Sequence, residues 1–329
     1  MTDRMRDAAQ AAIWTFGRTL LGAALGVGLV AAVVLGGPAK AVAQDAAATS
    51  PAVRAIPQTQ GNGPVLWVIR DADSTIYLLG TVHVLRPATA WGSPRLEQAF
   101  DSADQVFFEI ENPGDQAALL PLIRQHGVSP DRPLSHLIST GDLNLLQLSA
   151  STIGSSAAQM DMFRPWLAAL TLSVSPLIEA GYDPNSGVEM VLRARALANG
   201  QPVKGLETID QQVRIMAGFS EPAQLAFLHA TLKAFDEAPT ELDRMVGAWA
   251  AGDIAALNAI FAEGMEESGP EVNRSLLTDR NRQWAGQIRT LLEGEGTIFI
   301  AVGAAHLMGE GSVQDYLAER GVEVEEAGR

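Results

Sequence analysis

The sequence lacks cysteine altogether, although it is 329 residues long. The protein therefore has no disulfide bond and no thiolate ligand for a metal ion, and it is not a lipoprotein attached through a cysteine. Basic residues are also few: 23 Lys and Arg stand against 38 Asp and Glu, and the formal net charge is −15. Because such a surface repels nucleic acid and anionic lipid, we expect no nucleic-acid partner.

Charge is absent from an apolar stretch near the N-terminus, residues 19–39. Arg4, Arg6 and Arg18 precede it, and the small-residue sequence Ala-Val-Ala at 41–43 follows it. A basic start, an apolar middle and an A-x-A end predict a secretory signal peptide over residues 1–43, cleaved after Ala43. The stretch is also close to membrane-spanning length, so an uncleaved anchor is the alternative. In both cases we expect export, to the periplasm or the cell exterior.

The rest of the chain divides into a short linker and one large region. Residues 44–63 are rich in Ala, Thr, Gln, Pro and Gly, a composition typical of a flexible linker. Residues 64–329 are long enough for a sizeable core, as one domain or two coupled lobes. No C-terminal membrane segment is evident, so we expect no stable membrane span once a signal is cleaved. The sequence leaves two alternatives open: a cleft that closes within one chain, and a cleft that closes across a homodimer.

Four short apolar runs predict the strands of a buried sheet, at residues 75–80, 105–111, 202–207 and 297–303. Another run at 65–71 is predicted to pair with the first of them in a β-hairpin. Residues 115–200 and 221–292 carry apolar residues at three- and four-residue spacing, which indicates helices. This order predicts an α/β fold: a central mixed sheet from two βα-type halves, with a large helical insert.

Two distant stretches read almost alike, TIYLLGTVHV at 75–84 and TIFIAVGAAHL at 297–307. Each is a strand-like run that reaches a Gly and, three residues later, a His. Gly lets the chain leave a strand sharply, because it has no Cβ to obstruct a close approach of backbones. One Gly-x-x-His is weak evidence, but two after matched strands, in a chain with five His, predict that His83 and His306 meet in one site.

The ends of the predicted core strands deliver two imidazoles and two carboxylates: His83, Glu109, Glu207 and His306. In open α/β sheets, ligands bind beyond the carboxyl ends of the strands, so these side chains are expected to surround one cleft. Nitrogen and oxygen donors without sulfur suit Mn, Fe, Co or Zn. They equally suit a metal-free acid/base pair in which a carboxylate orients an imidazole.

Each candidate also has a structural interpretation. Either histidine alone is about as well explained by a hydrogen-bonded core position. Glu111 is a rival to Glu109, two residues on and on the same side of the strand. Glu207 precedes a helix and could interact with its N-terminus. Arg280 fits an exposed helix face, but an Arg beside an acidic site could also hold a substrate carboxylate.

The motifs together closely resemble those of the TraB/GumN/PrgY family. They are GTVH, ADQVFFEIE, RPWLAAL, SGVEMVLRARALANGQPVKGLETIDQQ, LLTDRNRQWA and VGAAH, in that order, from about residue 65 to the C-terminus. The resemblance extends to the Tiki metalloproteases and, more distantly, to erythromycin-esterase and ChaN-like proteins. It implies an α/β fold with His83, Glu109 and His306 as catalytic or metal-binding residues around one cleft. Glu207 falls in the family's GLET segment and Arg280 in its RN segment.

The leading hypothesis is an exported hydrolase that depends on a divalent metal ion (Mn, Co or Zn) and acts on a peptide or small polar substrate. His83, Glu109 and His306 would bind the ion, which would lower the pKa of bound water. Glu111 or Glu207 would be the general base. One alternative is a metal-independent, esterase-like hydrolase in which His83 activates water and a carboxylate orients it. The other is a non-catalytic protein that binds a peptide or saccharide.

Overall fold

The computed structural model describes residues 55–328, without the side chains of residues 266 and 267. The predicted signal peptide, residues 1–43, lies outside the described residues, and so do residues 44–54 of the predicted linker. Across residues 55–328, no helix has the length and apolar character needed to cross a membrane.

The centre of the fold is a mixed sheet, which confirms the predicted α/β class. Among the described residues, six strands form it in the order β4-β3-β5-β2-β1-β6. The first four are parallel to one another, whereas β1 is antiparallel to both β2 and β6. The strands are β1 (Leu66–Arg70), β2 (Ser74–Thr81), β3 (Gln105–Ile110), β4 (Val203–Glu207), β5 (Gly296–Gly303) and β6 (Glu325–Glu326).

The two Gly-x-x-His motifs lie side by side because β2 and β5 pair in parallel along their whole length. Gly80 is opposite Val302 and Thr81 is opposite Gly303, so the motifs are staggered by one residue. A Cβ on Gly80 would lie 3.1 Å from the Cα of Ala304, so a side chain there would push the two turns apart. The predicted meeting of the two halves is therefore observed at the level of the backbone.

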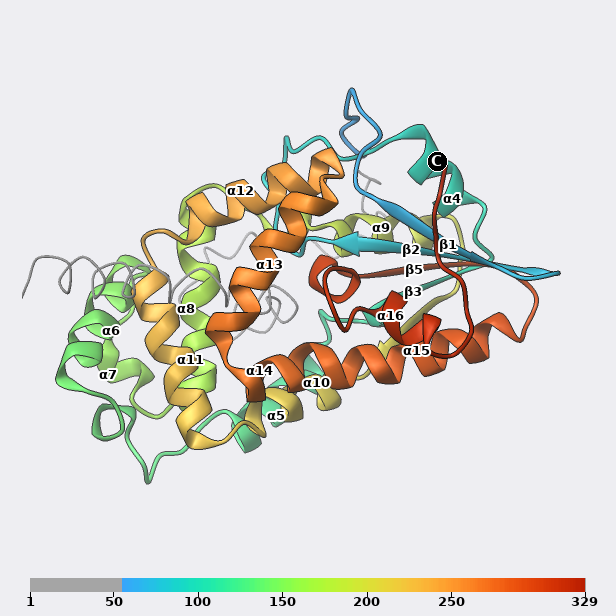
Figure 1. Ribbon diagram of the computed structural model, residues 1–329. Helices are drawn as coiled ribbons and strands as arrows, with labels where there is room; N and C mark the ends of the chain where they lie inside the picture. Colours follow the sequence, from blue (N-terminus) through green and yellow to red (C-terminus); the bar gives the residue numbers. More distant parts are fainter. Residues whose placement is uncertain (1–54, 329) are drawn as a thin grey trace, which may run out of the picture.

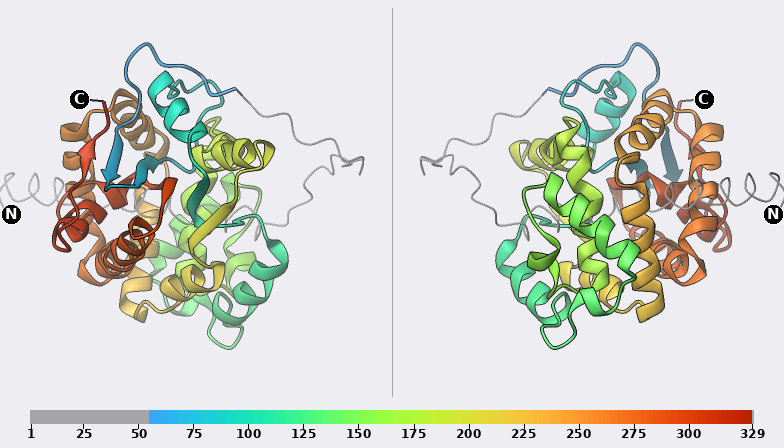
Figure 2. Two further views of the ribbon diagram at one scale, coloured as in Figure 1. Left: turned by 90° about the vertical axis from the view of Figure 1, so that its right-hand side faces the viewer. Right: turned by 90° about the vertical axis from the view of Figure 1, so that its left-hand side faces the viewer.

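Helices form an insert at one end of the sheet and cover its faces (Figure 1). In the insert, α8 packs against α11, which also packs against α6, and the right-hand view of Figure 2 shows these helices facing the viewer. The helices are α4 (Pro94–Asp101), α5 (Gln116–His126), α6 (Thr140–Thr152), α7 (Ala157–Met160), α8 (Pro165–Glu179), α9 (Val188–Ala198), α10 (Ile209–Ala217), α11 (Glu221–Ala234), α12 (Ala238–Ala251), α13 (Ile254–Ser268), α14 (Pro270–Asn273), α15 (Asp279–Leu292) and α16 (Val313–Ala318).

Two predicted boundaries differ from the structure. The linker was predicted to extend to residue 63, but Ile56 is buried and Gln58 forms a β-bridge with Gly92, so the folded part begins earlier. Burial of one large apolar side chain explains why a polar, Pro-containing segment joins the core there. The sequence VEVEEA at 322–327 predicts a last strand, but that strand, β6, is only Glu325–Glu326 long.

Candidate active site

Four predicted site residues meet at the carboxyl edge of the sheet. Glu109 belongs to the end of β3 and Glu207 is the last residue of β4, whereas His83 follows β2 by two residues. His306 lies in a 3-10 turn, η5 (Ala304–Leu307), directly after β5. All four residues are buried, with 2–9% of their surface exposed. Because burial is common to all of them, only their contacts distinguish a structural role from a catalytic one.

Arg280 is the cation at the centre of this cluster. Its Nη2 donates to Glu109 Oε2 at 2.6 Å and its Nε to Glu207 Oε1 at 3.0 Å. Its Nη1 lies 3.0 Å from the carbonyl oxygen of Leu276 and 3.1 Å from His306 Nε2. The π-helical turn η4 (Arg274–Thr278) immediately before α15 supplies that carbonyl. Irregular turns of this kind often occur at functional sites, because they redirect side chains. Arg280 thus holds two of the protein's own carboxylates.

Glu109 is ionised despite its burial. Its Oε1 accepts the backbone N–H of Gly303 at 2.8 Å, and its Oε2 also accepts from Gln212 Nε2 at 3.0 Å. Burial alone would raise the pKa of Glu109, but the charge of Arg280, the two histidines and the Gly303 hydrogen bond outweigh it. The pKa of Glu109 is lowered to about 2.

His83 has two ring nitrogens in different environments. Nδ1 lies 2.8 Å from Glu189 Oε1, and the hydroxyl of Thr81 donates to the same carboxylate. Nε2 is buried, has no hydrogen-bond partner among the residues that the structure describes, and lies 3.9 Å from Glu109 Oε1. Burial lowers the pKa of His83, but the charge and hydrogen bond of Glu189 and the charge of Glu109 more than compensate. The pKa of His83 is therefore raised above its usual 6.5.

His306 has the opposite character. Its Nε2 accepts from Arg280, which leaves Nδ1 as the donor to Asn281 Oδ1 at 2.5 Å. Its ring also packs on Trp284, with the centroids 4.4 Å apart. Burial and the adjacent guanidinium lower the pKa of His306 to about 3, so this imidazole is neutral. The surroundings of the two histidines thus move their pKa values in opposite directions. Such a contrast favours His83 as the group that can exchange a proton and His306 as a structural group.

Gly303 keeps the space between these side chains open. A Cβ at this position would lie 3.1 Å from Glu109 Oε1, 3.3 Å from His83 Nε2 and 3.6 Å from His306 Cδ2. The absence of a side chain at Gly303 is therefore required by the packing of the site itself, in addition to the role of glycine at the strand end.

Glu111 does not join the cluster, although the sequence made it a rival of Glu109. It follows β3, is exposed, and lines a neighbouring cavity. Glu207 does reach the cluster, but both of its oxygens bind Arg280, so it is committed to an ion pair. The sequence analysis missed Glu189, because a Glu in the first turn of a helix such as α9 is ordinary. Only its contact with His83 distinguishes it.

The predicted metal ion fits the observed donors poorly. Within the described residues, no group of three His, Asp or Glu side chains could hold an ion. Arg280 contacts His306 Nε2, which is a donor atom that an ion shared by His83, Glu109 and His306 would need. A divalent ion there would also be repelled by the fixed guanidinium charge. Metal binding therefore stays a prediction from the sequence.

At the carboxyl edge of the mixed sheet, two Gly-x-x-His turns meet beside two carboxylates and a buried Arg. This combination is the one that the sequence motifs led us to expect for a single protein family. The chain belongs to the TraB/PrgY/gumN family, whose sequence model matches residues 65–326, and the family inferred from the motifs is thereby confirmed.

Similar proteins occur in Treponema pallidum and Escherichia coli. An uncharacterized protein of Treponema pallidum (strain Nichols) is 22% identical over 270 residues, covering 78% of this chain and 80% of the relative. The uncharacterized protein YbaP of Escherichia coli (strain K12) is 23% identical over 256 residues, covering 77% of this chain and 92% of YbaP. No solved structure matches the chain significantly. These relatives support the family and assign no reaction.

Proposed function

We propose that the protein is a hydrolase of amide or ester bonds, with His83 as general base and no metal ion. The contrast between the two nitrogens of His83 supports this most. Nδ1 is held by the Glu189 carboxylate, whereas Nε2 is buried, without a partner, and faces the ionised Glu109. General-base catalysis by an imidazole requires this arrangement: a carboxylate holds one ring nitrogen, and the second nitrogen is free to accept a proton.

In the proposed reaction, Nε2 of His83 takes a proton from a water molecule, and the water oxygen bonds to the carbonyl carbon of the substrate. Glu189 accepts the Nδ1–H hydrogen bond, which fixes the tautomer and stabilises the imidazolium as it forms. The electron pair of the carbonyl double bond moves onto the carbonyl oxygen as the water adds. The imidazolium then returns the proton to the leaving amine or alkoxide as the carbon–nitrogen or carbon–oxygen bond breaks.

The test uses protein purified without chelator after expression of the full chain. It is assayed against p-nitrophenyl esters and a fluorescence-quenched peptide library, with and without EDTA. We expect cleavage of one substrate class, no effect of EDTA, and a loss of about 100-fold or more in kcat/KM for His83→Asn. His229→Asn is the matched control, because His229 pairs with Asp142 between α11 and α6, far from the sheet edge. It should keep full activity.

Three outcomes would contradict this proposal. Full activity of the His83→Asn variant would exclude the imidazole as the base. Loss of activity in EDTA, restored by Mn, Co or Zn, would favour the metal-dependent hydrolase predicted from the sequence. Absence of hydrolysis of every ester and peptide by folded protein would favour the non-catalytic binding protein.

A further inference from the structure

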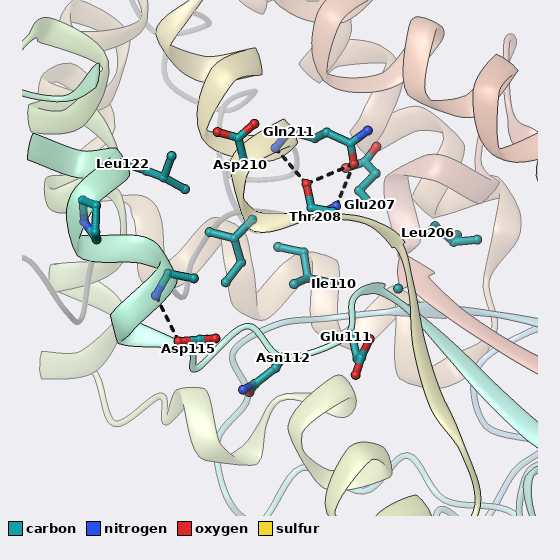
Figure 3. A pocket seen from close by; sticks show the side chains of 14 residues that line it. Ile110, Glu111, Asn112, Asp115, Leu122, Leu206, Glu207, Thr208, Asp210 and Gln211 are labelled. Atoms are coloured by element: carbon teal, nitrogen blue, oxygen red, sulfur yellow. Dashed lines mark hydrogen bonds between the residues drawn. The ribbon is translucent and has the colours of Figure 1, made fainter. Parts of the chain in front are cut away.

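A cavity lies beside the cluster, at the carboxyl ends of β3 and β4, and the proposed reaction does not use it (Figure 3). Its volume is about 720 Å³, and residues of α5 and α10 line it together with the two strand ends. This volume is in the range of pockets that enclose a ligand, and this edge of an open α/β sheet is where ligands bind.

The lining of the cavity combines acidic and apolar side chains and contains no Lys or Arg. Figure 3 shows four acidic residues in the lining: Glu111 after β3, Asp115 at the start of α5, Glu207 at the end of β4, and Asp210 in α10. Asp115 caps its helix and Asp210 pairs with Arg214 at 2.7 Å. In the part of the chain that the structure describes, the Glu111 side chain has no partner. The apolar lining is Ile110, Pro121, Leu122, Leu206 and Ile209.

Glu207 connects this cavity to the cluster, because it lines the cavity while its carboxylate binds Arg280. In the strand order β4-β3-β5-β2, the strand that precedes His83 is two to three positions from the cavity. At about 4.8 Å per strand, that separation is about 10–14 Å. An extended peptide advances about 3.3–3.6 Å per residue, so a substrate side chain about three or four residues from the reacting bond would reach the cavity.

We propose that this cavity is the specificity site of the hydrolase and binds a Lys or Arg side chain of a peptide substrate, about three or four residues from the cleaved bond. The aliphatic part of such a side chain packs on the apolar lining while its charged end stays among the carboxylates at the rim. Charge complementarity selects this occupant, because an acidic or phosphorylated segment would be repelled by the same carboxylates. The cleavage part of this inference rests on the proposed function, whereas the binding part does not.

The experiment measures binding by the full-chain His83→Asn variant, so that no cleavage occurs. The probes are two fluorescein-labelled octapeptides that are identical except for one Lys or N-acetyl-lysine, and anisotropy reports the dissociation constant. We expect the acetylated peptide to bind about tenfold more weakly, because it keeps the length and loses the charge. Glu111→Gln should weaken binding of the Lys peptide by about three- to fivefold, the effect of one partly exposed charge pair. Glu319→Gln, an exposed acid at the end of α16, is the control and should change nothing.

Equal binding of the two peptides, no effect of Glu111→Gln, or tighter binding of a Glu-containing peptide would overturn the inference. The two proposals fail separately. A Lys preference in binding without hydrolysis by the wild type would refute the proposed function and leave the cavity as a binding site. Hydrolysis of peptides without regard to basic residues would refute the cavity as specificity site and leave the reaction in place.

Discussion

Replacing Arg280 by Met should strongly destabilise the protein, because it removes the cation that two buried carboxylates share. Arg280 and Glu109 are each 4% exposed, and Glu207 is 6% exposed. The pKa of Glu109 is about 2 against an ordinary value of 4.5, and this difference corresponds to about 3 kcal/mol at pH 7. Breaking one buried ion pair typically costs about 3–5 kcal/mol, so we expect a loss in this range.

The pH dependence of this loss has a definite sign. In the wild type, the folded pKa of Glu109 lies below the unfolded value, so its stabilisation is complete above about pH 4.5 and is lost as the pH falls toward 2. In Arg280→Met, burial acts without the Arg charge and raises the pKa of Glu109. The carboxyl then takes up a proton on acidification, so the deficit of the variant should be largest at pH 7 and smaller near pH 4.5.

Urea unfolding followed by tryptophan fluorescence measures this free energy at both pH values. Arg289→Met, on the same helix, is the matched control, because Arg289 is exposed and its pairing with Glu293 contributes little. If Arg280→Met does not fold, the same variant with Glu109→Gln and Glu207→Gln should fold better, since no buried charge is left unpaired. A loss below about 1 kcal/mol, or a loss that does not change with pH, would refute the reasoning.

Further predictions follow from the site and the N-terminus. Gly303→Ala should abolish most activity while the protein stays folded by circular dichroism, because the new methyl group would fill the space beside Glu109 Oε1; full activity would contradict this steric role. Activity should rise with pH around a midpoint above 6.5, since the pKa of His83 is raised. Glu189→Gln should lower that midpoint, and an unchanged midpoint would contradict the effect of Glu189 on the pKa of His83. Metal analysis of chelator-free protein should find no stoichiometric Mn, Co or Zn, and near-stoichiometric metal would restore the metal-dependent hypothesis. N-terminal sequencing of exported protein should begin at Gln44, whereas an intact N-terminus in the membrane would favour the anchor.

Helix starts and buried strands were predictable because they depend on local chemistry. Thr and Ser are residue types that favour the N-cap of a helix, and Thr208 and Ser312 both form capping boxes in the structure. The length and β-branching of residues 297–303 predicted β5 within one residue. The short last strand and the packing of Ile56 could not be predicted, because each depends on which surface of the sheet is left uncovered.

The sequence by itself determined the α/β class, the family, and the placement of His83, Glu109, Glu207 and His306 at strand ends. Strand periodicity and glycine chemistry act within a few residues, so a pattern in the sequence is enough for these. Only the tertiary structure decided which of these side chains contact one another. It places Glu189 on one nitrogen of His83 and Arg280 between two carboxylates, and it leaves Glu111 outside. Burial and charge pairing shift the pKa values of His83, Glu109 and His306, and both arise from residues far apart in the chain.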